Sequence, residues 1–394
     1  MNRREFLATT IASSVAFAAG AASTGSKPRV AVIGHTGHGD YGHGLDTVWL
    51  RLPEVDLVAV ADADPNGLAK AQKKLKLEKG YADYRQMLAE VKPDIVAVAP
   101  RHLEEHRDMM LAAIEAGARG IYCEKPFCRT PAEADAIIAA ADQHGVKIAV
   151  AHRNRYHPVV PVVQRLMKEE AIGRLLEIRC RGKEDARGGA EDLWVLGAHL
   201  LNLAVVYSGK PVAVSALLAQ DGRPVTKSDI REGAEGIGPI AGNQAHARFD
   251  TDNGVPIFFD SLANAGVKTA GFGLQLIGTK GIVDFRCDTE PLAQICLGNP
   301  FQPAKEPRAW TPISSAGIGQ PEPIADLKEQ VSLHLLPARD LIAAMNENRQ
   351  PLCSAADGRL VIEMIMAVFA SHRQNSQRVA FPLTDRENPL AQWT

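Results

Sequence analysis

The chain has 394 residues, of which 46% are hydrophobic and 23% are charged, so it is long enough for two domains with sizeable cores. Its formal net charge of −2 offers no basic surface to a nucleic acid. We therefore expect no nucleic-acid partner. We also expect no stable membrane span, because no apolar stretch of the sequence is long enough to cross a bilayer.

The first 22 residues have the character of an export signal. Residues 2–7, with the sequence NRREFL, resemble a bacterial twin-arginine signal, and a mildly apolar stretch follows over residues 8–19. Small residues from Gly20 to Ser23 supply a cleavage site of the A-x-A type. We expect residues 1–22 to be a twin-arginine signal peptide, which implies the twin-arginine export machinery as a partner and a periplasmic location. The alternative is an amphipathic N-terminal helix with a chance pair of arginines.

Apolar β-runs then alternate with helical patterns. The β-runs cover residues 29–34, 55–61, 94–100, 120–123 and 146–150. Such alternation predicts a doubly wound parallel sheet with helices on both faces. One helix start is well marked, because the sequence TPAE at residues 130–133 combines a capping box with Pro at the first helical position. We expect a Rossmann domain, of the α/β class, over residues 27–152.

The pattern changes after residue 153. Helical patterns over residues 159–170 and 193–207 flank a β-run at 175–181. Five more β-runs with short connections follow, at residues 212–219, 244–249, 256–261, 272–277 and 281–285. Close succession of strands predicts an antiparallel sheet. Two helices, at 338–346 and 355–371, close the chain, whereas residues 222–242 and 299–323 look irregular. We therefore expect an α+β domain over residues 153–394.

A glycine-rich loop follows the first β-run and precedes a helical stretch at residues 45–50. It begins at Gly34, carries Thr36 where a strict G-x-G-x-x-G motif has glycine, and contains Gly37 and Gly39. A dinucleotide's pyrophosphate binds at such a loop between a strand and a helix. We expect these four residues to bind the coenzyme; the alternative is a flexible turn.

Asp62 ends the second β-run, 28 residues after Gly34. A carboxylate there can accept hydrogen bonds from the adenosine ribose hydroxyls, and it repels a 2′-phosphate. The predicted coenzyme is therefore NAD rather than NADP. The alternative is an aspartate that only closes the turn at the strand end.

Three histidines of the glycine-rich loop raise the question of a metal. His35, His38 and His43 lie near Asp40, and together they could ligate zinc. Their spacing matches no local zinc motif, and the glycines between them would leave the ligands poorly ordered. The six cysteines show neither metal-site spacing nor a disulfide framework. We expect no metal site.

The tripeptide Glu124-Lys125-Pro126 follows the β-run at 120–123. With the Gly34 loop and Asp62, it makes the chain resemble the Gfo/Idh/MocA oxidoreductases, the group of glucose-fructose oxidoreductase and inositol dehydrogenase. Further marks of the resemblance are residues 100–106, 123–127, 154–158, 197–199, 278–281 and 363–373. The resemblance implies that the second domain has a large open sheet. That sheet often mediates oligomerisation in the family, so we expect a homo-oligomer, either a dimer or a tetramer.

The resemblance also implies roles for single residues. Lys125 would contact the substrate hydroxyl that becomes a carbonyl, and Pro100, Glu124 and Lys125 would lie against the coenzyme. An ammonium group there also stabilises alkoxide character as hydride leaves. His199 matches the family's active-site histidine. The alternatives are a surface lysine in a turn and a buried core histidine.

The family's usual carboxylates are missing beside His199. The aspartate four residues before this histidine is replaced by Val195, and the one three residues after it by Asn202. Glu191 or Asp192 could supply the missing group. We take Asp192 as the catalytic candidate, although it could equally be a helix N-cap.

Three further side chains are candidates for substrate binding. Arg155, Tyr156 and Lys183 suit a polyhydroxylated ligand. For the charged residues among them, a solvated surface position is the alternative.

Export limits what such an enzyme can do, because NAD is not freely supplied outside the cytoplasmic membrane. We expect an exported NAD(H)-dependent oxidoreductase that acts on a sugar or polyol hydroxyl and recycles a tightly held coenzyme. A redox-neutral enzyme is the alternative: transient oxidation would acidify a neighbouring C–H, and a glycosidic bond would then be eliminated. A second alternative is a non-catalytic module that binds a sugar or a nucleotide.

Overall fold

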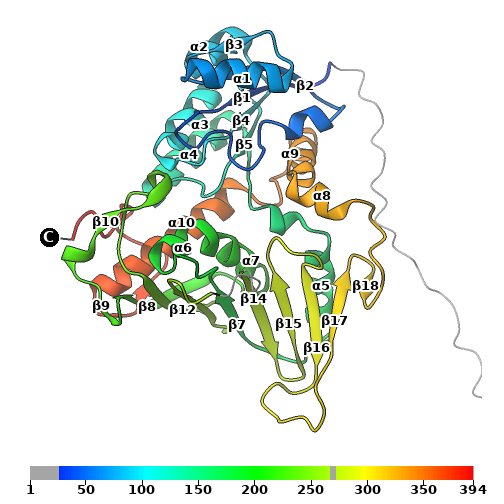
Figure 1. Cartoon of the computed structure of the whole chain (residues 1–394), viewed down its shortest axis with the longest axis vertical. Helices are drawn as coiled ribbons and strands as arrows, with labels where there is room; N and C mark the ends of the chain where they lie inside the picture. Colours follow the sequence, from blue (N-terminus) through cyan, green and yellow to red (C-terminus); the bar gives the residue numbers. More distant parts are fainter. Residues whose placement is uncertain (1–25, 267–271, 394) are drawn as a thin grey trace, which may run out of the picture.

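The computed structural model describes residues 26–266 and 272–393, and each half of the chain builds one main sheet (Figure 1). The expected signal peptide, residues 1–22, lies outside the described residues. Within the described ranges, no helix combines the length and the apolarity that a membrane crossing requires.

The first sheet has six strands in the order β3-β2-β1-β4-β5-β6, and all neighbours pair in parallel. The strands are β1 (Arg29–Ile33), β2 (Asp56–Ala61), β3 (Gly80–Tyr81), β4 (Ile95–Val98), β5 (Gly120–Cys123) and β6 (Lys147–Val150). From β1 the chain builds β2 and β3 on one side and then crosses to build β4, β5 and β6 on the other side of β1. The topological switch point therefore lies between β1 and β4. The predicted doubly wound parallel sheet is confirmed.

Helices cover both faces of this sheet, which explains why its strands read as unbroken apolar runs. They are α1 (Pro65–Leu75), α2 (Tyr84–Val91), α3 (His106–Glu115) and α4 (Pro131–His144), with 3₁₀ turns η1 (Val48–Arg51) and η2 (Leu103–Glu105). Helix α4 starts as predicted, since the Thr130 hydroxyl accepts a hydrogen bond from the Glu133 amide at 3.2 Å. The helix expected at residues 45–50 is instead the single turn η1.

The second sheet has eleven strands among the described residues. In chain order these are β7 (Leu175–Arg181), β8 (Pro211–Gln220), β9 (Arg223–Pro224), β12 (Gln244–Thr251), β13 (Ile257–Leu262), β14 (Gly273–Gly278), β15 (Gly281–Arg286), β16 (Ala293–Leu297), β17 (Trp310–Ser314), β18 (Gly317–Ile318) and β19 (Val379–Ala380). Neighbours are antiparallel except for the parallel pair of β7 and β13. The predicted, mostly antiparallel sheet of an α+β domain is confirmed.

Two segments expected to be irregular contain short strands. Strands β17 and β18 lie within residues 299–323, and the small hairpin of β10 (Arg231–Glu232) and β11 (Pro239–Ile240) lies within 222–242. A proline in a short sequence segment argues against a strand, because proline cannot donate a hydrogen bond to the neighbouring strand. Proline is nevertheless tolerated near the edges of sheets. Pro312 lies in β17, close to one edge of the large sheet.

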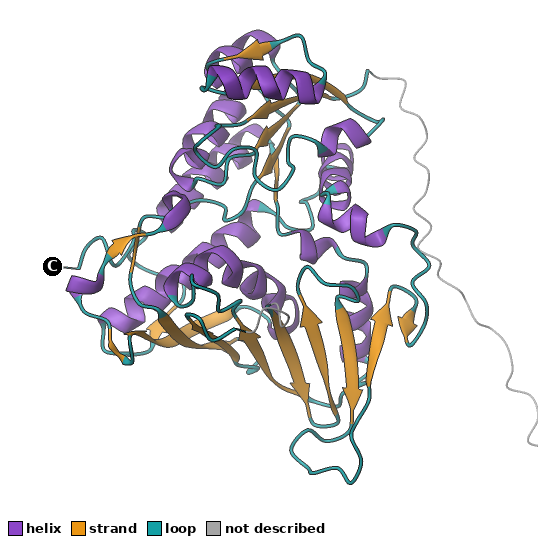
Figure 2. Cartoon of the chain, in the orientation of Figure 1, coloured by secondary structure: helices purple, strands orange, loops and turns teal. Residues whose placement is uncertain are grey.

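Helices also pack on the large sheet, and several lie between the two sheets (Figure 2). The helices and turns that follow β6 are η3 (Arg153–Tyr156), α5 (Val159–Lys168), α6 (Ala190–Asp192), the π turn η4 (Leu193–Gly197), α7 (Ala198–Ser208), η5 (Lys227–Asp229), η6 (Ala234–Gly236), α8 (Leu327–Ser332), α9 (Leu335–Glu347) and α10 (Ala355–Arg373). Helix α10 contacts both β8 and α4, so it joins the two halves of the chain.

Helix α9 returns from the second half to the first sheet and packs on β5 and β6. Its buried residues Leu335, Ala338, Leu341 and Met345 recur at helical spacing and belong to the same core as the apolar face of β1. This return places the turn before α9 close to the end of β5, where Lys125 lies.

Candidate functional site

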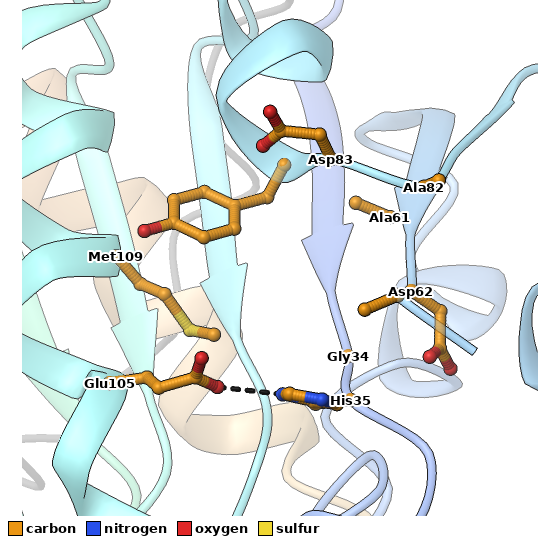
Figure 3. A pocket seen from close by; sticks show the side chains of 10 residues that line it. Gly34, His35, Ala61, Asp62, Ala82, Asp83, Glu105 and Met109 are labelled. Atoms are coloured by element: carbon orange, nitrogen blue, oxygen red, sulfur yellow. Dashed lines mark hydrogen bonds and ion pairs between the residues drawn. The ribbon is translucent and has the colours of Figure 1, made fainter.

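A cavity of about 170 Å³ opens at the carboxyl ends of β1 and β2, beside the topological switch point (Figure 3). Gly34 and Asp62 lie at its wall, and Tyr84 and Met109 supply apolar surface. Ligands of open parallel sheets bind in this position. A lining that combines the Gly34 backbone with the side chains of Tyr84 and Met109 suits the adenosine half of a dinucleotide.

The glycine-rich loop approaches other backbone segments too closely for a side chain. A Cβ on Gly39, whose φ is +90°, would lie 2.4 Å from the Arg101 amide nitrogen. A Cβ on Gly34 would lie 2.1 Å from the ring of Tyr41. The loop therefore has no room for side chains at Gly34 and Gly39, whereas Gly37 has open space around it, and no regular helix follows the loop directly.

Four side chains of the loop bond to four different carboxylates of the same domain. The pairs are His35–Glu105 at 2.7 Å, His38–Glu104, Tyr41–Asp62 at 2.7 Å and His43–Glu124 at 2.8 Å. The carboxylates follow three strands: β2, β4 and β5. These bonds hold a loop that has no helix to anchor it. We call them the loop clasp.

The loop histidines do not converge on one point. Each bonds to its own glutamate, so His35, His38 and His43 form no common ligand set. Within the described residues, one group has the spacing of metal ligands: His38, His102 and Glu104, whose ligand atoms lie within 4.8 Å of one another.

Asp62 lies at the end of β2 as expected, but its carboxylate is occupied by protein donors. Oδ1 accepts from the amides of Thr36 and Asp64, both at 3.0 Å. Oδ2 accepts from the hydroxyls of Thr36 at 2.6 Å and Tyr41 at 2.7 Å. Burial alone would raise the pKa of Asp62, but these hydrogen bonds lower it. In Figure 3 the carboxylate turns away from the cavity, so a ribose hydroxyl would have to displace one of these donors.

A second cavity, of about 50 Å³, lies at the carboxyl end of β5. It is lined by Lys125 and His199, together with His43, Glu124, Ala151, Arg153, Leu196, Asp288 and His334. Lys125 is only 5% exposed, and its Nζ donates one long hydrogen bond, 3.4 Å, to the Val195 carbonyl. The structure therefore brings together Lys125 and His199, two of the three residues that the sequence suggested for chemistry.

The π turn η4 precedes His199 and forms part of the cavity wall. π turns inside helices occur often at functional sites. Here η4 carries Val195 and Leu196, so the wall beside Lys125 consists of an apolar side chain and a main-chain carbonyl. Val195, the position where the resemblance led us to expect an aspartate, therefore supplies no charge.

His199 bonds to a second buried histidine. Its Nδ1 lies 3.3 Å from the Nδ1 of His152, which follows β6, so one ring donates and the other accepts. Burial, with the nearby Lys125 charge, lowers the pKa of His199 well below its ordinary value and that of His152 to about 3. Both imidazoles are therefore neutral at physiological pH, and the ring that donates this hydrogen bond keeps a free acceptor nitrogen, Nε2.

Glu124 and His334 each direct an unpaired atom into this region. Burial alone would raise the pKa of Glu124, but a hydrogen bond from His43 and the Lys125 charge lower it to about 2. Its Oε2 has no partner among the described residues. The Tyr122 hydroxyl, kept neutral by burial, shares a hydrogen bond of 2.6 Å with His334 Nδ1. The other ring nitrogen of His334, Nε2, is buried and has no partner among the described residues either.

The carboxylate that completes the cavity comes from Asp288, in the turn between β15 and β16. Arg153 binds it through Nε at 3.1 Å and Nη2 at 2.9 Å, and the Asn154 amide donates to it at 3.2 Å. The sequence pattern gave no signal for Asp288 or His334, because both lie in turns far from the Lys125 motif.

Asp192 lies elsewhere. It is fully buried, and its Oδ2 accepts from the Ser261 hydroxyl at 2.6 Å and the Glu184 amide at 3.1 Å. It does not line the cavity of Lys125 and His199. Its neighbour Glu191 forms an ion pair with Arg231 at 2.9 Å. The structure therefore gives both carboxylates contacts of their own, away from the expected catalytic group.

The residues expected to bind substrate also lie off the cavity wall. The Arg155 guanidinium donates to the Asn202 carbonyl at 2.9 Å, and the Tyr156 hydroxyl accepts from the Cys353 amide at 3.1 Å. Lys183 lies 3.9 Å from Asp185 at the surface. Pro100 is buried at the end of β4, where its carbonyl accepts from His106 at 2.7 Å. Arg153 is the arginine that lines the cavity.

Comparison with known proteins connects the N-terminal third of the chain to one family. Residues 28–152 match the GFO_IDH_MocA family, described as an oxidoreductase family with an NAD-binding Rossmann fold. Levoglucosan dehydrogenase of Pseudarthrobacter phenanthrenivorans is 25% identical over 356 residues, which cover 80% of this chain and 87% of that protein. D-apiose dehydrogenase of Paraburkholderia graminis is 28% identical over 195 residues, 46% of this chain and 51% of that protein.

The fold has solved counterparts. A structure of levoglucosan dehydrogenase in complex with NADH and L-sorbose superposes with a TM-score of 0.71 at 23% sequence identity, and the match covers 90% of this chain and 99% of that one. At this identity the structural likeness shows a shared fold.

Proposed function

We propose that this chain is an NAD-dependent oxidoreductase of the Gfo/Idh/MocA type and that it acts on a hydroxyl of a sugar or polyol. The observation that carries this proposal is the position of Lys125: a nearly buried ammonium group beside a neutral histidine, at the edge of the sheet where coenzymes of this fold bind. The relatives named for levoglucosan and D-apiose support a carbohydrate substrate.

The cavity's own residues account for hydroxyl oxidation. When bound, the nicotinamide supplies the acceptor for hydride. The Lys125 ammonium makes one long hydrogen bond, to the Val195 carbonyl, and its other N–H groups remain available to a ligand. It can therefore donate to the substrate oxygen and stabilise negative charge on that oxygen. His199 is neutral and can take the hydroxyl proton. The hydrogen bond between His199 and His152 helps to orient the His199 ring. Ala151 and Leu196 help to exclude water.

The location and assembly of the enzyme are part of the same proposal. The twin-arginine-like residues 2–7 support export to the periplasm by the twin-arginine machinery. Because NAD is scarce there, the enzyme would hold its coenzyme tightly and regenerate it in place. Exposed Val212, Leu217, Leu297 and Trp310 on the large sheet support a homo-oligomer built through that sheet.

The test is to denature the purified mature protein and identify any released nucleotide by mass spectrometry. We expect NAD or NADH in near-stoichiometric amount. Candidate sugars are then added to the native protein while the nicotinamide absorbance is followed, and we expect reduction with at least one. A protein that contains no nicotinamide coenzyme and binds none when it is offered would contradict the proposal.

A redox-neutral cleavage of glycosides is the second candidate. The observation that favours it is the neutral His152–His199 pair, which can accept a proton from carbon as well as from oxygen. Product analysis separates the two reactions. A keto-sugar or lactone indicates net oxidation, whereas a cleaved glycoside with unchanged coenzyme indicates elimination.

A further inference from the structure

Asp288 is held rigidly but keeps part of its capacity to accept hydrogen bonds. The Arg153 guanidinium bonds to both carboxylate oxygens of Asp288. The Asn154 side chain donates to Oδ1 of Asp288 and accepts a hydrogen bond from the Asp288 backbone amide at 3.3 Å. Arg153 is itself fixed, since its Nη1 donates to the Ser332 carbonyl at 3.1 Å. A carboxylate has about four acceptor sites. Three of those of Asp288 are in use, and Oδ2 carries only one of these bonds.

The environment keeps this carboxylate ionised. Burial alone would raise the pKa of Asp288, but the hydrogen bonds and charge of Arg153, with smaller contributions from Asn154 and Lys125, lower it. The side chain is 33% exposed, so a ligand in the cavity can reach it. Asp192 has neither property, because burial raises its pKa and it is fully buried away from the cavity.

We propose that Asp288 is the substrate-binding carboxylate of this site, and that it selects uncharged, hydroxyl-rich substrates over sugar acids. This inference rests on the proposed function, since it concerns the cavity of Lys125. Oδ2 of Asp288 accepts a hydrogen bond from a hydroxyl near the one that Lys125 holds. Asp288 thus supplies, from a turn 93 positions further along the chain, the negative charge that Val195 does not.

The charges in the cavity support this substrate class. Lys125 and Arg153 face Glu124 and Asp288, and the imidazoles of His199 and His334 are neutral because burial lowers their pKa values, that of His334 to about 4. Arg153 is already paired with Asp288, so it is not free to bind a substrate carboxylate. A sugar acid that placed its carboxylate at Oδ2 would face a like charge, whereas a hydroxyl there gains a charge-assisted hydrogen bond.

The backbone permits a clean test. Asp288 has a φ of +59°, a left-handed conformation that asparagine tolerates as well as aspartate does. Asp288→Asn therefore keeps the turn and the size of the side chain while removing the charge. Glu290→Gln is the matched control, since it lies in the same turn, bonds to His157 at 3.2 Å and does not line the cavity.

The experiment titrates the NADH-loaded protein and its two variants with paired sugars, glucose against glucuronate and galactose against galacturonate, and follows the NADH fluorescence. Wild type and Glu290→Gln should bind the neutral member at least tenfold more tightly. Asp288→Asn should bind neutral sugars about tenfold more weakly and lose most of the discrimination against the acids.

Two results would overturn the inference: an unchanged neutral-to-acid ratio in Asp288→Asn, or wild-type protein that prefers the acids or binds no neutral sugar. Coenzyme content is measured first on every preparation. Failure to bind NADH would refute the proposed function, whereas an NADH-loaded protein with an indifferent Asp288→Asn variant would refute only the role of Asp288.

Discussion

The coenzyme loop and the Lys125 cavity use polar side chains in opposite ways. In the loop clasp, His35, His38, Tyr41 and His43 each bond to a carboxylate, and the acceptor sites of Asp62 are full. In the cavity, buried atoms of Glu124 and His334 have no partner among the described residues, and in the clasp the same holds for Oε2 of Glu104. Unpaired buried polar atoms are costly, and the two in the cavity lie where a ligand can pair with them.

This comparison shows that the type of a residue does not by itself tell whether the residue binds a ligand or holds the protein together. Asp62, Asp192 and Asp288 are all buried or partly buried aspartates near the ends of elements. Only Asp288 combines a fixed position, access from the cavity and a free acceptor site. The four predictions below test this division between self-satisfied and ligand-directed groups.

The largest effect is expected at Lys125. Lys125→Met keeps the apolar stem and removes the ammonium, so the rate of hydride transfer should fall by about 10³, within the range for loss of a positioned donor. Coenzyme content should stay unchanged, because the loop clasp is intact. Stopped-flow nicotinamide absorbance measures the rate, and Lys168→Met, at the exposed end of α5, is the control. A wild-type rate in Lys125→Met would show that the ammonium takes no part.

A second prediction concerns stability at acid pH. His334 has a pKa lowered from 6.5 to about 4, chiefly by burial, so between these values the unfolded chain binds more protons than the folded one. Stability should therefore fall as pH drops from 6.5 to 4, by on the order of 3 kcal/mol from this group. His334→Asn, which suits the residue's φ of +63°, should flatten that slope in urea unfolding. His144→Asn at the exposed end of α4 is the control, and an equal slope in His334→Asn would refute the prediction.

The contact between the two buried imidazoles gives a smaller effect. His152→Asn removes the ring that holds His199 Nδ1, and loss of one buried hydrogen bond should lower kcat about tenfold. The pH profile of kcat should shift as well, because the environment of His199 changes. If kcat and its pH profile both match wild type, His152 has no part in positioning His199.

The smallest effect is expected at Tyr41. Tyr41→Phe frees one acceptor site on Asp62 for a ribose hydroxyl, so NAD should bind about fivefold more tightly, close to 1 kcal/mol. Calorimetry on protein stripped of its coenzyme measures the dissociation constant. Tyr81→Phe, which loses a hydroxyl contact to Glu90 at the surface, is the control. Weaker binding in Tyr41→Phe would mean that the loop clasp supports the coenzyme rather than competing with it.

Much of the fold could be predicted from the sequence because its signals are local. Buried parallel strands such as β4 and β5 read as unbroken apolar runs, and the start of α4 is fixed by Thr130 and Pro131. The helix predicted at 193–207 was found as η4 and α7, since the π turn leaves the apolar pattern nearly unchanged. The structure that follows the glycine-rich loop was less predictable. No regular helix follows it, and the loop clasp that holds it depends on carboxylates far away in the sequence.

The site could be predicted only where a motif marks it. Lys125 and His199 stand in recognisable contexts, and the structure places them on one cavity. Asp288 and His334 have no such context, since each is a single polar residue in a turn at positive φ, and only the return of α9 and the pairing of β15 with β16 bring them to Lys125. Long-range arrangement, rather than local pattern, selects these side chains.

The return of α9 also bears on how the polypeptide matures. The apolar layer under β1 and β5 is not closed until residues as late as Met345 have been synthesised. While the ribosome is still translating the second half, the nascent nucleotide-binding half exposes a hydrophobic groove that only its own distant continuation can fill. A fragment that stops near residue 152 would expose that groove permanently, and we expect chaperones to bind there.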